Sequence, residues 1–278
     1  QDISKWNTSK VVNMFGAFTN ASAFNQDIGN WDMSNVVDIR TMLAGATSFS
    51  QDIGKWDISN ITDMYQLFQQ GGAPIGIENW DTSKVTGMGS MFARNEIFNK
   101  DIGNWNTSSV TNMNNMFFGA SLFNQDLTGW CVTNITSEPS QFAINSALTQ
   151  ANFPIWGTCP SPNSSVGNTT GTSSNTSSSN TGNTPVTSSG LIYLDSNGVT
   201  IKCPNANVGD IETVNGKVYE VVDNASLKAK VDNDEDVTCV CTSFVTNMST
   251  LFQDKPNFNQ NIQSWDTSSV TNFTMMFA

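Results

Sequence analysis

The sequence predicts an α/β-type repeat solenoid, in which each coil holds a short parallel strand and a helical turn, with a small β-rich cap. Two observations support the solenoid. One phrase of sequence returns at a nearly fixed interval, and its copies carry large apolar residues at the same offsets. A third observation, a group of tight-turn signals outside the repeats, predicts the cap.

Tryptophan marks the repeat. Six tryptophans follow one another at intervals of 25, 25, 24, 25 and 25 residues, and a seventh occupies the same slot of a later copy. This period is typical of leucine-rich-type coils. One copy cannot bury its apolar side chains alone, whereas stacked copies cover one another. We therefore expect one column of core, lined by Trp6, Trp31, Trp56, Trp80, Trp105, Trp130 and Trp265.

The unit of residues 100–124 shows what a coil is expected to contain. Its β-branched run predicts a short strand at 109–112. A helical turn is expected over 114–119, because apolar residues recur there at helical spacing: Val110, Met113, Met116 and Phe117. A polar return loop would follow, and the strands of successive coils would pair in parallel.

The phrase FNQDI-x-x-W-D-T-S-x-V-T-x-M-x-x-M-F resembles the repeat of the BspA-like, leucine-rich-related surface proteins, the DUF285 family. Members occur in bacteria such as mycoplasmas and in some microbial eukaryotes. The resemblance covers residues 1–130 and 241–278, and eight or more positions recur at fixed offsets. It implies a repeat protein of the cell surface or exterior, usually of unassigned activity. The fourth copy departs from the phrase, with APIGIEN at 73–79.

Composition divides the chain into five parts. Residues 1–130 form the first repeat array, and the phrase dissolves at 131–160, which we expect to cap that array because a stacked core needs an atypical end unit. Residues 161–190 are rich in Ser, Thr and Asn, hold no aromatic or charged residue, and are typical of a linker.

The rest of the chain predicts a second array with its own cap. Tight-turn signals at SNG and NG predict hairpins within 191–240, and a helix is expected to start near Asn224. The repeat phrase then resumes in 241–278. The first and last residues both fall inside a repeat phrase, so either the sequence is a segment of a longer polypeptide or its ends stack on a neighbouring copy. We expect self-association in which arrays of neighbouring copies meet head to tail.

The five cysteines lie in the caps and none lies inside a repeat. We expect Cys131 to pair with Cys159, and Cys203 with Cys241. Cys239 could pair with Cys203 instead, or between chains. Disulfides persist outside the cytosol. A metal site at CVC (239–241) is disfavoured, because it lacks His and a Cys-x-x-Cys pair.

The composition favours an extracellular or cell-surface location. Charged residues make up 13% of the chain, His is absent and the net charge is −12. So acidic a chain is a poor partner for nucleic acid, because phosphate binding needs clustered cations. No apolar run is long enough to span a bilayer.

Glycans are the expected modification. The linker sequons are open to N-linked sugars, and its Ser and Thr to O-linked sugars. An Asn-, Ser- and Thr-rich chain also forms sequons by chance. The sequons lie at Asn7, Asn20, Asn60, Asn106, Asn134, Asn163, Asn168, Asn175, Asn224, Asn247 and Asn272.

We do not expect an enzyme. Without His, a Ser–His or Cys–His pair is impossible, and rows of repeated Asp are unlike a unique catalytic constellation. These side chains are expected to close turns by accepting backbone N–H groups. Ca²⁺ between stacked carboxylates is a less favoured alternative, and no other cofactor is expected. The rows are Asp2, Asp27, Asp52, Asp101 and Asp126, and Asp32, Asp57, Asp81 and Asp266.

Two functions fit these features. The favoured one is a structural subunit of a glycosylated extracellular fibre or surface layer built from stacked repeats. The alternative is a cell-surface adhesin that binds a glycan or a host protein. A fibre subunit should show contacts between array ends, and an adhesin should show an exposed aromatic or concave patch.

Overall fold

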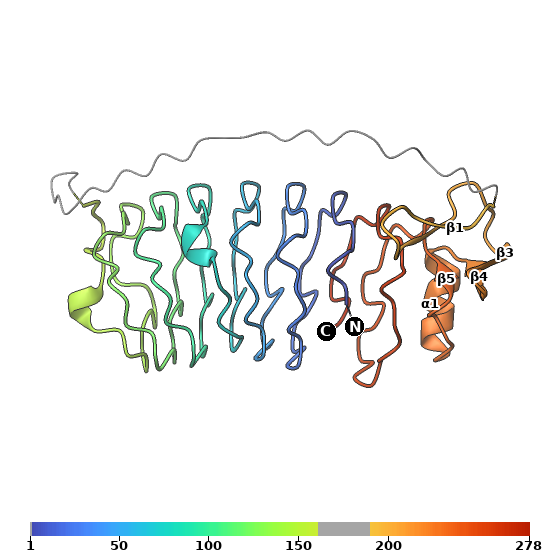
Figure 1. Cartoon of the computed structure of the whole chain (residues 1–278). Helices are drawn as coiled ribbons and strands as arrows, with labels where there is room; N and C mark the ends of the chain where they lie inside the picture. Colours follow the sequence, from blue (N-terminus) through green and yellow to red (C-terminus); the bar gives the residue numbers. More distant parts are fainter. Residues whose placement is uncertain (1, 161–189) are drawn as a thin grey trace.

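The computed structural model describes residues 2–160 and 190–278, whose repeat units stack into one elongated column (Figure 1). The order of units along the column differs from their order along the chain. The column starts at 190–241, continues through 242–278, and only then passes to the units of 2–130. Residues 131–160 form its other end. The predicted linker lies outside the described residues except for Gly190.

The predicted fold class, an α/β-type repeat solenoid with a strand and a helical turn in each coil, is wrong. The described repeat units consist of turns and irregular backbone, and none contains an α-helix. Between the described repeat units, parallel pairing is limited to isolated bridges, such as Asn13–Asp38 and Gly87–Asn112. No continuous parallel sheet therefore runs through the described units. Two 3-10 helices occur, η1 (Ile77–Asn79) and η2 (Gln150–Asn152).

Left-handed residues explain why helical spacing does not give a helix. Asn115 and Gly119 have φ of 57° and 69°. An α-helix requires φ near −63° at every residue, so two left-handed residues four positions apart end it. Other units repeat this pair of left-handed positions: Gly16 and Asn20, Thr41 and Gly45, Gln66 and Gln70, Ser90 and Arg94.

The backbone amides of these turns alternate between two kinds of partner. Met116 N donates to Met113 O at 3.1 Å, within the unit, whereas Phe117 N donates to Phe142 O at 2.8 Å, in the next unit. Half of the amides thus tie successive units together. The spacing of Met113, Met116 and Phe117 therefore reflects consecutive tight turns and not an α-helix.

Segment 190–241 holds two small sheets and one helix at the end of the column (Figure 1). One sheet is an antiparallel pair, β1 (Tyr193–Leu194) and β2 (Ile201–Lys202). In the other, β4 (Lys217–Val221) pairs antiparallel with β3 (Ile211–Val214) and parallel with β5 (Val240–Cys241). The helix α1 spans Asn224–Asp232.

Local sequence accounts for these elements. Asn215 and Gly216, between β3 and β4, have φ of 52° and 78°, the combination that a tight hairpin turn requires. Helix α1 begins at Asn224, as the sequence predicts, because the Asp223 carboxylate accepts the amide of Ser226 at 2.8 Å. Leu227 and Val231 on α1 are buried in the same core as the repeat units, so α1 covers that end of the column.

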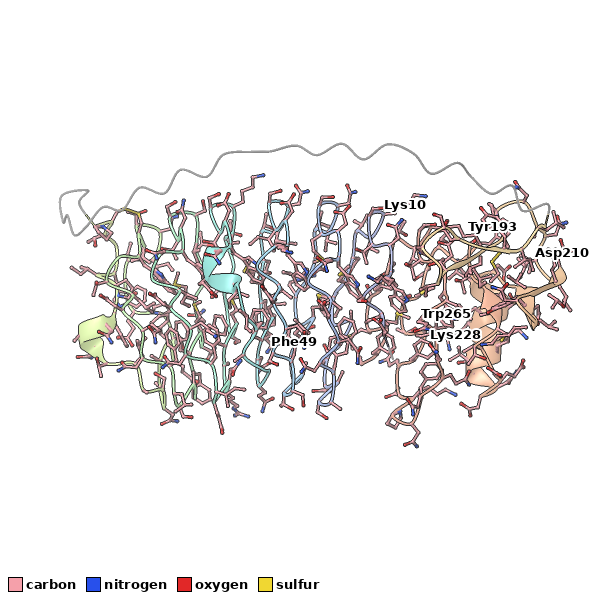
Figure 2. All side chains as sticks on the ribbon, viewed as in Figure 1. Lys10, Phe49, Tyr193, Asp210, Lys228 and Trp265 are labelled. Atoms are coloured by element: carbon pink, nitrogen blue, oxygen red, sulfur yellow. A yellow bond between two sulfur atoms is a disulfide. The ribbon has the colours of Figure 1, made fainter. Side chains whose placement is uncertain are left out.

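The core of the repeat units is one continuous cluster of buried side chains along the column (Figure 2), and a second, smaller cluster lies in segment 190–241. Phe49 and Trp265 lie inside it, whereas Lys10 lies on the outside. The seven repeat tryptophans are 1–5% exposed. Six of them donate Nε1–H to a carbonyl of the preceding unit at 2.9–3.2 Å: Trp31, Trp56, Trp80, Trp105, Trp130 and Trp265.

Candidate functional site: the junction between the first and last units

The first and last units lie against each other in mid-column, where the blue and red ends of the sequence meet in Figure 1. We call this contact, between residues 6–18 and 265–277, the junction. The head-to-tail contact expected between copies is therefore present within one chain. Its backbone hydrogen bonds run from Val12 N to Thr271 O (2.8 Å), Phe273 N to Asn13 O (2.9 Å) and Phe277 N to Ala17 O (2.9 Å).

The backbone hydrogen bonds of the junction have the same pattern as those at other steps in the column. Between consecutive units, Val37 N donates to Val12 O and Phe18 N to Met42 O, both at 2.9 Å. The Thr267 hydroxyl donates to Asn7 O at 3.1 Å, just as Thr8 donates to Asp32 O at 3.0 Å. Stacking therefore does not require that two units be neighbours in the chain.

Aromatic rings fill the junction. The Trp6 indole lies between Trp31 and Phe273, with ring centroids 6.2 and 5.5 Å away. Phe18 stacks on Phe277 at 5.5 Å with an interplanar angle of 7°. Burial of rings of this size is the largest favourable contribution that such a contact offers.

One side of the junction opens into a groove of about 770 Å³. Its walls are the return loop of 18–24, with Gln26, and that of 252–259, and its floor includes Phe277 and Ala278. Phe24 and Phe258 in these walls are only partly buried, whereas Phe49, Phe98 and Phe123 at the same repeat position are at most 1% exposed.

Trp6 is the exception in the tryptophan row. Its indole Nε1–H is buried and has no hydrogen-bond partner among the described residues. By repeat position its acceptor would be the carbonyl of Ile262, as Ile3 O is the acceptor of Trp31 at 3.2 Å. The junction thus has the backbone hydrogen bonds and the ring contacts of other steps, but it lacks the hydrogen bond from the indole N–H to a carbonyl.

The two Asp rows close turns. Each of these carboxylates accepts the backbone amide two residues on, as in Asp27 to Gly29 (3.0 Å) and Asp57 to Ser59 (3.0 Å). Hydroxyl and amide donors lower the pKa of Asp2, Asp32, Asp57, Asp81 and Asp126. The described residues contain no group of three or more His, Cys, Asp or Glu side chains placed to hold a metal ion.

Asp266 differs from the other members of its row because it is buried, with 3% exposure. It pairs with Lys202 of β2 at 3.1 Å and accepts the Ser243 hydroxyl at 2.7 Å. Burial by itself raises the pKa of Asp266, but hydrogen bonds from Ser243, Ser268 and Lys202 outweigh it and hold the pKa below the ordinary value. This ion pair joins segment 190–241 to the unit that forms the junction.

The disulfides join Cys131 to Cys159 and Cys203 to Cys241, the two pairs that the sequence favours. Cys239 is a partly buried free thiol. Both bridges lie toward the ends of the column, outside the stacked units. Two disulfides fit an extracellular protein. Within the described residues no helix is long and apolar enough to cross a membrane.

The sequons fall into two groups, according to whether the Asn side chain already donates a hydrogen bond. Asn60 and Asn134 already donate Nδ2–H to a neighbouring unit at 2.7 and 2.8 Å, and Asn224 donates to Thr246 at 3.0 Å. Exposed sequons without such a bond in the described residues are Asn7, Asn20, Asn106 and Asn247, and Asn272 is partly buried. Asn163, Asn168 and Asn175 lie outside the described residues.

Sequence reasoning placed the core tryptophans but not the groove or the exceptional Trp6. The available signal was that 6–18 and 265–277 carry the same phrase, so each presents the faces that a neighbouring unit needs. The repeated phrase does not predict which copies pack against each other in space.

Comparison with known proteins gives one match. The family model described as "Mycoplasma protein of unknown function, DUF285" matches residues 1–75, 72–156 and 219–278. The matched segments include both sides of the junction. No curated protein and no solved structure matches the chain.

Proposed function

Since this chain belongs to the DUF285 family, whose function is not known, we propose that it is a structural subunit of an extracellular fibre or surface layer. In this proposal the column of stacked repeats is the part that builds the fibre or layer. The observation that carries the proposal is the junction, where two segments from opposite ends of the chain stack as consecutive units do.

Assembly follows from the same contact made between copies. A chain with its junction open offers two complementary faces, 6–18 and 265–277. Faces of this kind join head to tail, and a head-to-tail contact that does not close into a ring gives a filament. The acidic net charge of −12 favours solubility of the single chain before assembly.

Glycans belong to the same proposal. Asn7, Asn20, Asn106 and Asn247 are the best acceptors, because their side chains are exposed and their Nδ2 atoms make no hydrogen bond within the described residues. Intact mass of the secreted protein, compared with the mass of the bare sequence, tests this part. A mass equal to the bare sequence refutes glycosylation and leaves assembly to be judged by its own experiment.

Disulfide trapping tests assembly. Asn13 and Asn272 are parallel bridge partners across the junction, so Asn13→Cys with Asn272→Cys, in a Cys239→Ser background, cross-links any junction that forms. We expect cross-linked multimers on non-reducing gels that increase with protein concentration. The matched control is Asn13→Cys with Asn112→Cys, two positions in different bridges. Cross-linked monomer alone at every concentration would overturn the proposal.

A further inference from the structure

Two Asn-Gly pairs occur in the chain, at Asn197–Gly198 and Asn215–Gly216. The first lies in the turn between β1 and β2, and the second in the turn between β3 and β4 at the end of the column (Figure 1). Such a pair suits a tight turn. It is also chemically reactive, because glycine has no Cβ to keep its backbone nitrogen away from the side-chain carbon of the asparagine before it.

Hydrogen bonds hold the first pair in place. The Asn197 Oδ1 accepts the amides of Val199 and Thr200, both at 2.9 Å, and its Nδ2 donates to the Thr200 hydroxyl at 2.8 Å. The amide of Gly198 is engaged as well, since it donates to Asp195 O at 3.0 Å. The side-chain carbon and the glycine nitrogen therefore approach each other only when these contacts break.

The second pair has no such contacts. The Asn215 side chain is exposed and makes no hydrogen bond within the described residues. Over the same part of the chain, the amide of Gly216 has no acceptor. The ladder of the hairpin begins on either side of the pair, where Val214 is the partner of Lys217. Both reacting groups of this Asn-Gly pair are thus available.

We propose that Asn215 is a site of spontaneous deamidation and that Asn197 is protected from it. The Gly216 nitrogen loses its proton to hydroxide and attacks Cγ of Asn215, so a C–N bond forms. The bond from Cγ to Nδ2 then breaks, and the departing nitrogen takes up a proton and leaves as ammonia. Water opens the resulting five-membered imide at one of its two carbonyls. The products are aspartate and isoaspartate, in which the backbone runs through the side-chain carbon.

The modification alters the hairpin of β3 and β4. Either product carries a carboxylate in place of a neutral amide, which adds a negative charge to a chain of net charge −12. Isoaspartate also inserts one carbon into a turn whose two residues have φ of 52° and 78°. Because loop length sets the pairing of a hairpin, the pairing of Val214 with Lys217 is weakened. This inference does not depend on the fibre proposal, since it concerns one chain and water.

Peptide mapping by mass spectrometry tests the site on the full folded chain, incubated at mildly alkaline pH. Asn215 should convert about tenfold or more faster than Asn197, because reaction at Asn197 first requires hydrogen bonds to break. In denaturing urea the two sites should convert at similar rates, since glycine follows both and neither keeps its contacts.

Asn215→Gln is the matched variant for the effect on the hairpin. Glutamine takes positive φ elsewhere in the chain, as at Gln66 with φ of 55°, so the turn is kept. Its longer side chain would have to close a six-membered ring, which forms far more slowly. During incubation, hydrogen exchange of the β3 and β4 amides should rise with the converted fraction in the parent chain and stay constant in the variant.

Three results would overturn the proposal. The first is conversion of Asn197 in the folded chain as fast as that of Asn215, including the case where neither converts. The second is a rate difference that persists in urea, because it would come from the flanking sequence and not from the hydrogen bonds. The third is an equal rise in hydrogen exchange of β3 and β4 in the incubated Asn215→Gln variant.

Discussion

The repeated tryptophan does two things at once. Its ring fills the column, with 1–5% exposure, and its Nε1–H satisfies a carbonyl of the unit before it, such as Ile28 O for Trp56 at 2.9 Å. Phenylalanine supplies only the first. Ile28 O also accepts the amide of Trp31 at 3.1 Å, so the indole is its second donor. The hydrogen bond therefore serves the indole, whose buried N–H needs an acceptor.

The exceptional Trp6 gives a matched pair of variants. Trp56→Phe removes the indole donor from Ile28 O, which keeps the amide of Trp31 at 3.1 Å, and should cost about 0.5–1.5 kcal/mol more than Trp6→Phe, which removes a donor that has no partner among the described residues. The ring volume lost is the same in both. Urea unfolding measures the difference, and equal losses would show that the indole hydrogen bond contributes nothing.

At the scale of the element, the repeat unit is a run of tight turns held by left-handed residues. Non-glycine residues occupy many of these positions, including the β-branched Thr41 with φ of 56°. Such a residue costs roughly 1–2 kcal/mol in this region. The cost is offset by the amides that alternate between the unit and its neighbour, because both sets of hydrogen bonds require that backbone.

Replacing Thr41 by glycine tests the strain. Thr41→Gly should raise the free energy of unfolding by about 0.5–1 kcal/mol, since the relief exceeds the entropy that glycine adds to the unfolded chain. Thr62→Gly, in the next unit and outside the left-handed positions, should lower it by about 0.5–1 kcal/mol. Thermal unfolding compares the two variants. A lower free energy of unfolding in both would argue against backbone strain at Thr41.

The ion pair of Lys202 and Asp266 predicts acid sensitivity of the end of the column. The folded-state pKa of Asp266 lies below its ordinary value of 3.8, so its stabilisation is present above pH 3.8 and is lost as the pH falls through the folded-state value. Segment 190–241 should loosen from the repeat units only as the pH falls below 3.8.

Asp266→Asn should lower the free energy of unfolding by about 2 kcal/mol at pH 7, because a hydrogen-bonded charge is lost. The substitution should also reduce the loss in the free energy of unfolding between pH 7 and pH 3. Urea midpoints at the two pH values measure both effects. Glu96→Gln, at an exposed position, serves as the control. If the free energy of unfolding of the Asp266→Asn variant falls as steeply with pH as that of the parent chain, Asp266 is not the source of the acid sensitivity.

For the whole molecule, the ends of the column need other means of stabilisation than its middle. A middle unit is covered on both faces, whereas an end unit has one neighbour only. The ends carry Cys131–Cys159 and Cys203–Cys241, and α1 covers one of them. A disulfide that closes a loop of this length contributes about 2–4 kcal/mol.

Removing one bridge should therefore act locally. Replacing Cys131 and Cys159 by serine should speed hydrogen exchange near Trp130 and leave the amides around Trp265 unchanged, since each unit contacts only its neighbours. Exchange measured by mass spectrometry resolves the two regions. Equal acceleration at both would mean that the column unfolds as one cooperative body.

The sequence was informative wherever a residue's role is set by the repeat itself. The buried tryptophans, the turn-closing Asp rows, the hairpin at Asn215–Gly216 and the start of α1 at Asn224 all follow from local pattern and period. The helical turn at 114–119 was wrong, because spacings of three and four residues fit tight turns as well as a helix. Only φ values such as 57° at Asn115 separate the two.

By itself, then, the sequence determined that units of about 25 residues bury one another's rings, because the apolar offsets leave no other cover. Only the tertiary structure decided which units meet. The recurring phrase gives the units similar faces, so residues 6–18 and 265–277 join in mid-column, where the indole of Trp6 lies without a hydrogen-bond partner among the described residues. Stacking energy depends on surfaces brought together in space, and a repeated sequence does not specify their order.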